Sequence, residues 1–391
     1  MRSKQLLGAV GLAGLVLLAG CGGFFPPNTT TTTTSTTGDY FYVANAGSAS
    51  VAASVVGFSI TSGVLGEVSS TATALQSGFT PTSVVVDRQD GLVYVGGNGA
   101  IYCFSIGTGG VLTAVSGGGA SIAGTVESMA TSPDGQWLLA LVYTTSDSIQ
   151  ISVLGINTST GVLATTGSVA SVAGPTAIPP KTIRISPAGN FVAVALGTLG
   201  DVCYGFTTST GVFTTSTTIP LLSTSVSDNA LTFSANSNYL FVGSTGSASG
   251  LSFISIYPIS STGVLQNVGT PLTIPSGDSP VALETDSTGT YLYSANHSSA
   301  SNISGYTFNN TTGKLTALTN SPFSASPSLT AMARDKSGDY MIATSSNGGT
   351  TGSNDVTLYG FDVYNAGQLD AIAVSTSGTD PAESIAVGVT H

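Results

Sequence analysis

A short glycine motif recurs seven times along this chain of 391 residues, at intervals of 47 to 54 residues. Seven units of about fifty residues therefore account for all of residues 38–391. A regular period of this length indicates a repeat architecture in which neighbouring units bury each other's faces. The motif, Gly-Val-Leu or a close variant, occurs at 63–65, 110–112, 161–163, 211–213, 263–265, 313–315 and 367–369.

Each unit shows the same internal order, which is clearest in residues 280–318. Four short apolar segments with alternating polarity are separated by turns rich in Asp, Asn, Ser and Gly, which predicts four antiparallel strands. These strands are expected at 281–283, 291–296, 303–308 and 314–318. No segment has the sustained period of a helix. Four-stranded sheets repeated four to eight times are typical of a β-propeller, so we predict an all-β fold with seven four-stranded antiparallel blades.

Two sets of positions in the second strand of each unit are mainly aromatic or aliphatic. Their spacing of two residues places both sets on one face of that strand. We interpret them as packing between blades and not as a ligand site. The sets are Tyr40, Leu92, Trp137, Phe191, Tyr239, Tyr291 and Tyr340, and Tyr42, Tyr94, Leu139, Ala193, Phe241, Tyr293 and Ile342.

The two ends of the repeat region predict how the propeller closes. The first unit begins at Asp39 with a second-type strand, so its blade lacks an innermost strand. Residues 384–387 match residues 128–131, an innermost strand, and would supply the missing one. We therefore expect the C-terminal strand to join the N-terminal blade, which removes exposed sheet edges.

The first twenty residues have the features of an export signal. Arg2 and Lys4 precede an apolar run too short to span a bilayer, and small residues follow it. Leu18-Ala19-Gly20-Cys21 resembles the lipobox of bacterial lipoproteins, which implies a signal peptide at 1–20 and lipidation of Cys21. Gly22 after the cysteine favours the outer membrane by the same resemblance, so we expect a lipid-anchored protein of the bacterial cell envelope. The alternative is an ordinary secreted protein.

Residues 21–38 are rich in Thr, Ser and Pro and lack apolar periodicity, which predicts a flexible tether before the propeller domain at 39–391. The two remaining cysteines, Cys103 and Cys203, fall in non-adjacent units. We predict that both are buried free thiols.

The charge content limits the possible functions. Only 27 residues are charged, and the formal net charge is −11, which becomes −13 after loss of the signal peptide with Arg2 and Lys4. This balance argues against nucleic-acid binding, which needs clustered Lys and Arg. Two distant histidines and isolated thiols cannot form a zinc site. We expect no metal, no cofactor and a monomeric protein.

Several short segments carry a resemblance to a known family: Ser132-Pro133-Asp134-Gly135, Tyr42-Val43-Ala44-Asn45 and Ser159-Thr160-Gly161-Val162-Leu163. They are similar to the lactonase family of seven-bladed propellers, which includes 6-phosphogluconolactonase-like proteins and borders the YVTN-repeat surface proteins. The resemblance covers about residues 39–391 and implies lactone hydrolysis by Arg, His and Glu side chains at the channel mouth. No family catalytic residue can be matched here, because His391 is terminal and His297 lies in a predicted loop.

The innermost strands should line a central channel. Aligned units place Thr82, Glu127, Lys181, Asn229, Val281, Thr330 and Glu383 at its mouth. Three residues along are Val85, Ala130, Arg184, Thr232, Glu284, Ala333 and Ala386, with Arg334 one step further. Glu284, Glu127 or Glu383 could act as general base on a water, and Arg184 or Lys181 could hold an oxyanion or a substrate anion. Of these, Glu284 and Arg184 are the candidate catalytic pair. The candidate ligand-binding residues are Glu127, Lys181, Asn229, Arg334 and Glu383. Alternatively, Arg184, Arg334 and Glu284 form a structural ion-pair network.

Two hypotheses for the function follow. In the first, the protein is a non-catalytic binding module, anchored to the membrane through Cys21, for a glycan, a protein or a small ligand. In the second, it hydrolyses a neutral lactone or ester at the channel mouth. A phosphorylated lactone is disfavoured because an acidic protein repels anions over a Debye length of about 8–10 Å. The shortage of His and Arg favours the first hypothesis, and the resemblance favours the second.

Overall fold

The computed structural model covers most of the predicted propeller domain. The chain divides into two units, Met1–Thr36 and Thr37–His391, and the fold below is that of the second. The predicted signal peptide, Cys21 and Glu383 lie outside the described residues. The described residues are 38–48, 51–174, 176–246, 252–260, 265, 272–273, 279–298, 302–346, 354–378 and 384–391.

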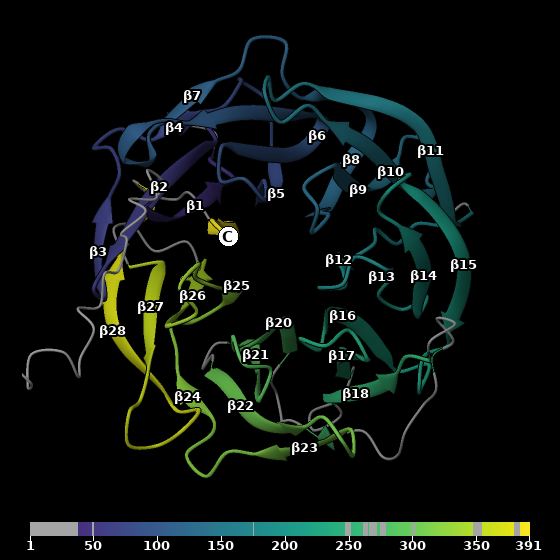
Figure 1. The fold of residues 1–391 in the computed structure, drawn as a ribbon, viewed down its shortest axis with the longest axis vertical. Coiled ribbons are helices and arrows are strands. Elements are labelled where there is room, and N and C mark those ends of the chain that lie inside the picture. The colour runs from purple at the N-terminus through teal and green to yellow at the C-terminus, as the bar shows by residue number, and fades with distance from the viewer. Residues whose placement is uncertain are drawn as a thin grey trace, which may run out of the picture. The chain divides into compact units, whose positions relative to one another are not determined.

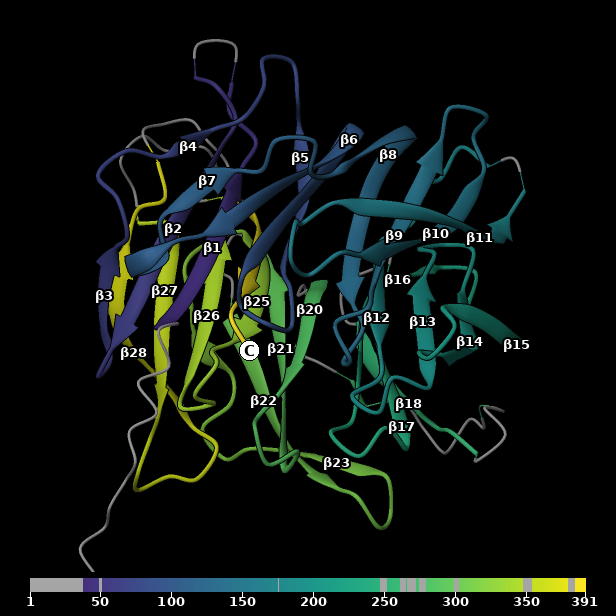
Figure 2. The ribbon, with the colours of Figure 1, turned by 45° about the horizontal axis from the view of Figure 1, so that its top comes forward.

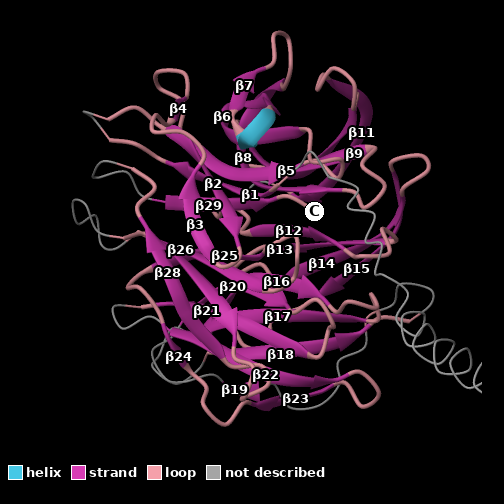
Figure 3. Cartoon of the chain, turned by 60° about the vertical axis from the view of Figure 1, so that its left-hand side comes forward, coloured by secondary structure: helices cyan, strands magenta, loops and turns pink. Residues whose placement is uncertain are grey.

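Hydrogen bonding groups the strands into six antiparallel sheets, which we number I to VI in chain order. Sheet I consists of β29 (Ser384–Val389), β1 (Asp39–Asn45), β2 (Ser54–Thr61) and β3 (Val64–Glu67), with β4 (Thr73–Ala74) paired to β2. Sheet II consists of β5 (Pro81–Val86), β6 (Leu92–Ile106), β7 (Leu112–Ala114), β8 (Ala120–Thr131), β9 (Trp137–Thr144), β10 (Ile149–Ile156) and β11 (Leu163–Ala173). The short 3-10 helix η1 (Thr108–Gly110) lies between β6 and β7 (Figure 3).

The remaining sheets each follow one repeat unit. Sheet III consists of β12 (Thr182–Ile185), β13 (Phe191–Ala195), β14 (Asp201–Thr207) and β15 (Val212–Ile219). Sheet IV consists of β16 (Val226–Phe233), β17 (Tyr239–Gly246), β18 (Phe253–Pro258) and β19 (Leu272–Thr273). Sheet V consists of β20 (Ser279–Thr285), β21 (Tyr291–His297), β22 (Asn302–Asn309), β23 (Lys314–Ala317) and β24 (Phe323–Ser324). Sheet VI consists of β25 (Leu329–Arg334), β26 (Tyr340–Ser345), β27 (Val356–Phe361) and β28 (Leu369–Ser375).

The first strand of each unit lies innermost, and these inner strands contact one another in a circular order. β29 contacts β5, and the contacts continue through β8, β12, β16, β20 and β25 back to β29. Figure 1 shows the sheets arranged around the ring of inner strands, and Figure 2 shows successive sheets side by side. The all-β, antiparallel prediction is therefore confirmed.

The blade count does not follow from the sheets alone. Strand β6 is 15 residues long and pairs with β8 of the next unit at Asn98 and Ile101, which joins two repeat units into the seven-stranded sheet II. Seven blades therefore remain a prediction.

The last strand pairs with the first, as predicted, but in a different register. Gly388 lies opposite Tyr42, the place that Ala130 takes opposite Leu139 in the third unit. The prediction had put Ala386 there, so it was wrong by two residues. A shift of two keeps the same side chains facing the core, so polarity alternation cannot detect it. A Cβ atom on Gly388 would lie 3.0 Å from the Val84 carbonyl oxygen, so glycine permits the close approach to β5.

The hydrophobic core lies between neighbouring sheets, and the predicted aromatic positions build it. Tyr42 and Tyr293 are fully buried, and their hydroxyls donate to the carbonyls of Gly110 and Gly367, at 2.8 Å in both cases. Both glycines belong to the repeat motif, and each lies in the next unit along the chain. The interpretation of these aromatics as packing between blades is confirmed. Cys103 and Cys203 are free and buried, also as predicted.

Candidate functional site

A cavity of about 340 Å³ lies where the inner strands meet. Five inner strands contain a β-bulge at the position predicted to form the channel mouth, where one residue is left out of the strand pairing. A bulge re-aims the side chain of the extra residue, here from the sheet ladder toward the cavity. The bulged residues are Thr82, Glu127, Asn229, Val281 and Thr330, and all five line the cavity.

The structure brings most of the predicted site residues to this one cavity. Glu127, Lys181, Arg184, Asn229 and Glu284 all line it. They come from four inner-strand regions, at β8, β12, β16 and β20.

Three other candidates stand apart from this group. Arg334 is half-buried and does not line the cavity; its Nη1 donates to the Thr285 carbonyl at 3.1 Å, beside the candidate base. Glu383 and Cys21 fall outside the described residues, so the structure does not place them.

Glu284 combines the features of a general base with those of a proton donor. Its side chain is half-buried, and burial raises its pKa, while Arg334 and Arg184 lower it. Its Oε1 accepts the Thr285 N–H at 3.3 Å. Among the described channel residues, neither arginine comes within the 4.0 Å of a direct ion pair with Glu284. The carboxyl group is therefore influenced by two cations but is not neutralised by a direct bridge to either.

Arg184 is held in place by its own strand. Its Nη1 donates to Thr182 Oγ1 and to the Ile183 carbonyl, both at 3.1 Å. Burial lowers its pKa, and Glu284 opposes that effect. Its other N–H groups have no partner among the described residues, which leaves them available to an anion or an oxyanion in the cavity.

Besides Glu284 and Arg184, the cavity is lined by a second carboxyl group, that of Glu127, and a second cationic side chain, that of Lys181. Burial raises the pKa of Glu127, and the charge of Lys181 lowers it. Asn229 is held by Thr245, whose Oγ1 accepts from its Nδ2 at 2.8 Å, and by the Ser227 hydroxyl, which donates to its Oδ1 at 2.8 Å. These groups can donate to and accept from the hydroxyls of a small polar ligand.

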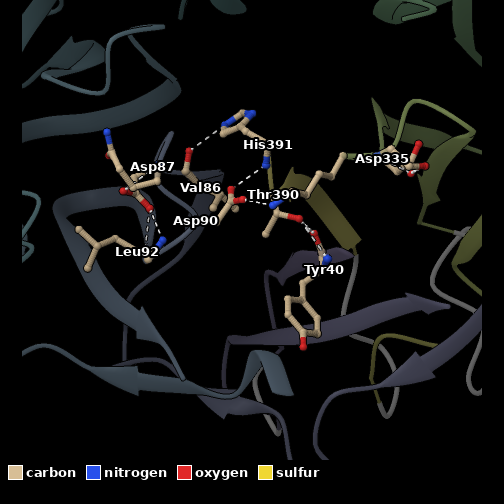
Figure 4. Close-up of polar contacts among 12 residues, drawn as sticks. Tyr40, Val86, Asp87, Asp90, Leu92, Asp335, Thr390 and His391 are labelled. Atoms are coloured by element: carbon tan, nitrogen blue, oxygen red, sulfur yellow. Dashed lines mark hydrogen bonds and ion pairs between the residues drawn. The ribbon is translucent and has the colours of Figure 1, made fainter. Parts of the chain in front are cut away.

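Sequence reasoning missed His391, which lines the cavity directly after β29. Its backbone N–H donates to Asp90 Oδ1 at 2.6 Å, and its Nε2 lies 3.2 Å from the Val86 carbonyl (Figure 4). Asp90 also pairs with Lys336. Desolvation, followed by the charge of Arg88, lowers the pKa of His391 to about 4, so its imidazole is neutral at pH 7. No sequence signal places it, because polarity alternation does not fix the register of β29.

His297, the other histidine, is the last residue of β21 and is absent from the cavity lining. Its Nδ1 lies 2.8 Å from the Leu329 carbonyl. The described part of the chain contains no cluster of three or more His, Cys, Asp or Glu residues that could hold a metal ion. It also contains no helix long and apolar enough to cross a membrane.

Comparison with known proteins supports the resemblance inferred from the repeats. Residues 201–332 match the family model described as lactonase, 7-bladed beta-propeller, which confirms the resemblance to that family. No curated protein sequence matches the chain.

Several solved structures are similar over nearly the whole chain. A proposed 6-phosphogluconolactonase from Bacteroides uniformis and the periplasmic gluconolactonase of Pseudomonas aeruginosa each have a TM-score of 0.69 at 16% identity, covering 90% of this chain and 99% of theirs. A protein from Lactobacillus plantarum has a TM-score of 0.68 at 16% identity, covering 91% of this chain and 100% of its own. At these identities the similarity concerns the fold alone.

Proposed function

We propose, for a chain whose residues 201–332 match the lactonase family of propellers, that the channel cavity binds a small lactone and hydrolyses it. The observation that carries this proposal is that Glu284, Arg184 and Glu127 line one shared cavity. A purely structural role for these charges would favour direct ion pairs in separate packed environments. No direct pair joins Glu284 to an arginine among the described channel residues.

The proposed reaction uses water as the nucleophile. Glu284 takes a proton from a water molecule, whose oxygen then forms a bond to the lactone carbonyl carbon. The carbonyl oxygen becomes an oxyanion, which the free N–H groups of Arg184 stabilise. When the tetrahedral intermediate collapses, the ring C–O bond breaks, and the leaving alkoxide takes the proton back from Glu284. The product is a hydroxy acid, and Glu284 is again a carboxylate.

The opposing effects on the pKa of Glu284 suit both of its roles, as proton acceptor and then as proton donor. Burial raises the pKa of its carboxyl, which makes the protonated form a usable donor, while Arg334 and Arg184 favour the carboxylate that accepts the proton. Arg334 thereby acts as a positioning and charge-balancing residue and not as a catalytic one.

We further propose that the substrate is a neutral lactone. The formal charge of −11 opposes the approach of anions. The Pseudomonas relative is named a periplasmic gluconolactonase, and an unphosphorylated gluconolactone would be such a neutral substrate.

The setting of this reaction is also a proposal. We infer a seven-bladed propeller in which sheet II holds two blades, because the repeat motif occurs in seven units. The lipobox-like segment supports export and lipid anchoring through Cys21 at the bacterial cell envelope, with the outer membrane favoured. The alternative of a non-catalytic module that binds a glycan, a protein or a small ligand uses the same cavity without turnover.

Turnover measurements separate the two functions. We expect the wild type to open neutral aldonolactones, and Glu284→Gln and Arg184→Met to lose roughly 10²-fold or more in kcat/KM. Matched controls are Glu67→Gln and Lys314→Met, whose side chains are exposed on β3 and β23. The panel includes 6-phosphogluconolactone and simple aliphatic lactones.

Each result has a defined meaning. Turnover that falls in the two channel variants but not in the controls supports hydrolysis. Absence of turnover by the wild type on the whole panel rejects the enzyme in favour of the binding module. Full activity in both channel variants removes Glu284 and Arg184 from the mechanism.

A further inference from the structure

Two buried aspartates lie at the junction of sheets III and IV. Asp201 begins β14, Asp228 lies in β16, and they are 2% and 5% exposed. Their strands belong to neighbouring sheets of the ring (Figure 1). The backbone of Asp228 exchanges two hydrogen bonds of 3.1 Å with Gly197, at the start of the turn that leads to Asp201. Both carboxyl groups are thus fixed where the two sheets meet.

The surroundings of this pair do not neutralise two negative charges. Neither carboxyl oxygen of Asp201 receives a hydrogen bond from a conventional donor group among the described residues. Asp228 Oδ1 accepts the Ser244 hydroxyl, and the two carboxyl groups act electrostatically on each other. Because the Asp201 carboxyl is buried without a donor beside a second carboxyl group, the two groups cannot both be ionised without a large free-energy cost.

Among the described residues, no cation shifts the pKa of either aspartate. The Cε atom of Lys181 would lie 3.3 Å from a Cβ on Gly197, but the charge of Lys181 acts on Glu127 and not on either aspartate. Ala195 lies opposite Asp201 in the strand pairing, and Tyr257 is close enough to feel the charge of both aspartates.

A third buried aspartate shows how such a group is otherwise satisfied. Asp355, 7% exposed, precedes β27 in sheet VI. Its Oδ1 accepts the Ser377 N–H at 2.6 Å, and its Oδ2 accepts the Ser377 hydroxyl. Asp87 and Asp286 are likewise buried and accept backbone N–H groups, whereas Asp201 has a second carboxyl group as its neighbour.

We propose that Asp201 and Asp228 share one proton at neutral pH and form a pH-sensitive latch between sheets III and IV. Loss of this proton leaves two adjacent anions in an apolar interface, and their repulsion separates the sheets at this point. Burial and the neighbouring carboxylate raise the pKa of Asp201 well above its usual range, and burial raises that of Asp228.

The other titratable side chains at the interface stay neutral while the latch titrates. Burial raises the pKa of Cys203 to about 12, and that of Tyr257 to about 12. A cavity of about 370 Å³ is lined by Thr198, in the turn before Asp201, and by Ser227, which precedes Asp228.

The latch adjoins the channel wall. Asn229, which directly follows Asp228, is the bulged residue that lines the channel cavity. Opening the latch therefore loosens one side of the channel mouth. This holds whether the channel is catalytic or not.

Thermal melting of the full chain between pH 5 and 10 tests the proposal. A raised carboxyl pKa stabilises the fold at low pH, and this contribution is lost as the pH rises through the folded-state value. Asp201→Asn keeps the shape and donates an amide N–H to Asp228 without titrating. As the pH rises, we expect the melting temperature of the wild type to fall relative to that of Asp201→Asn by roughly 2 °C per pH unit, until the latch has opened.

The two free cysteines supply a local readout. Cys203 lies two residues from Asp201 in the same buried interface, whereas Cys103 is buried in sheet II. We expect the ratio of Cys203 to Cys103 alkylation, measured by peptide mass spectrometry, to rise with pH in the wild type. In Asp201→Asn the ratio stays flat. The ratio cancels the general increase of thiolate with pH.

Asp286→Asn is the matched control, because Asp286 is also a buried aspartate and its carboxyl already accepts the Tyr291 N–H at 2.7 Å and the Thr288 N–H at 3.1 Å. We expect it to lower the melting temperature without changing the alkaline slope. The proposal fails if wild type and Asp201→Asn share one pH profile. It also fails if calcium chloride raises the wild-type melting temperature at pH 8 but not that of Asp201→Asn, because the pair would then hold a cation and not a proton.

Discussion

At the scale of single residues, the repeat motif encodes contact between neighbouring units. Gly110 has a φ of 82°, and a Cβ there would lie 2.7 Å from Cδ1 of the Tyr40 ring in the preceding unit. Gly313 and Gly367 stand in the same relation to Tyr239 and Tyr291, at 2.7 and 2.5 Å. The glycine is therefore required twice, once by the left-handed backbone and once by the ring that covers it.

Substitution of this glycine tests the double requirement. We expect Gly110→Ala to lower the free energy of unfolding by roughly 2–4 kcal/mol, through backbone strain and overpacking against Tyr40. Gly91→Ala is the control, because a Cβ there meets nothing within 4 Å and the backbone is not left-handed. Chemical denaturation of both variants measures the difference. Equal stabilities would mean that the turn tolerates a side chain and that the motif has another cause.

At the scale of strands, the phase of the repeat predicted most of the channel. The turn glycines and the aromatic positions set where each inner strand begins, and Thr82, Glu127, Lys181 and Asn229, which the repeat predicts for the channel, all line the cavity. These strands are joined to their neighbours by short turns, which transmit the phase from one strand to the next.

The closing strand lacks that constraint. No turn connects β29 to β1, and a slip of two residues preserves the polarity pattern. For this reason the register of β29 and the place of His391 were not predictable. The pair of Asp201 and Asp228 was missed for a related reason. The two residues belong to different repeat units, and the sequence pattern within one unit does not predict which side chains of the next unit it contacts.

Removal of the closing strand tests its part in the fold. Tyr40 and Thr390 exchange backbone and hydroxyl hydrogen bonds of 3.0 to 3.1 Å, in addition to the strand pairing (Figure 4). We expect deletion of residues 381–391 to lower the melting temperature by roughly 10 °C or more, because an apolar strand edge is exposed. Thr390→Val should cost far less. A truncated protein that melts like the wild type would show that sheet I does not need β29.

At the scale of the whole molecule, the scarcity of charge follows from the architecture. Most strands are buried against neighbouring sheets, and the turns use Gly, Ser, Thr and Asn, so the fold needs few charged side chains. Several of the 27 present gather in and around the channel, including Glu127, Lys181, Arg184, Glu284 and Arg334.

The net charge gives a salt dependence that distinguishes substrates. If the channel is catalytic, kcat/KM for a phosphorylated lactone should rise a few-fold between about 10 mM and 150 mM salt, because screening weakens its repulsion by the acidic protein. The value for a neutral lactone should stay constant. Steady-state kinetics over a salt series measures both. A phosphorylated substrate that is preferred at low salt would contradict the proposed neutral specificity.

The pairing of β1 with β29 also has a consequence for biosynthesis. Tyr40 and Thr390 are 350 residues apart in the chain, so the ribosome makes the second partner roughly 20–70 s after the first. During that interval the edge of β1 at Phe41 and Val43 lacks its partner strand, even if the other sheets have already folded. Sheet I can be completed only after synthesis has reached β29, so until then its unpaired edge exposes the nascent chain to aggregation.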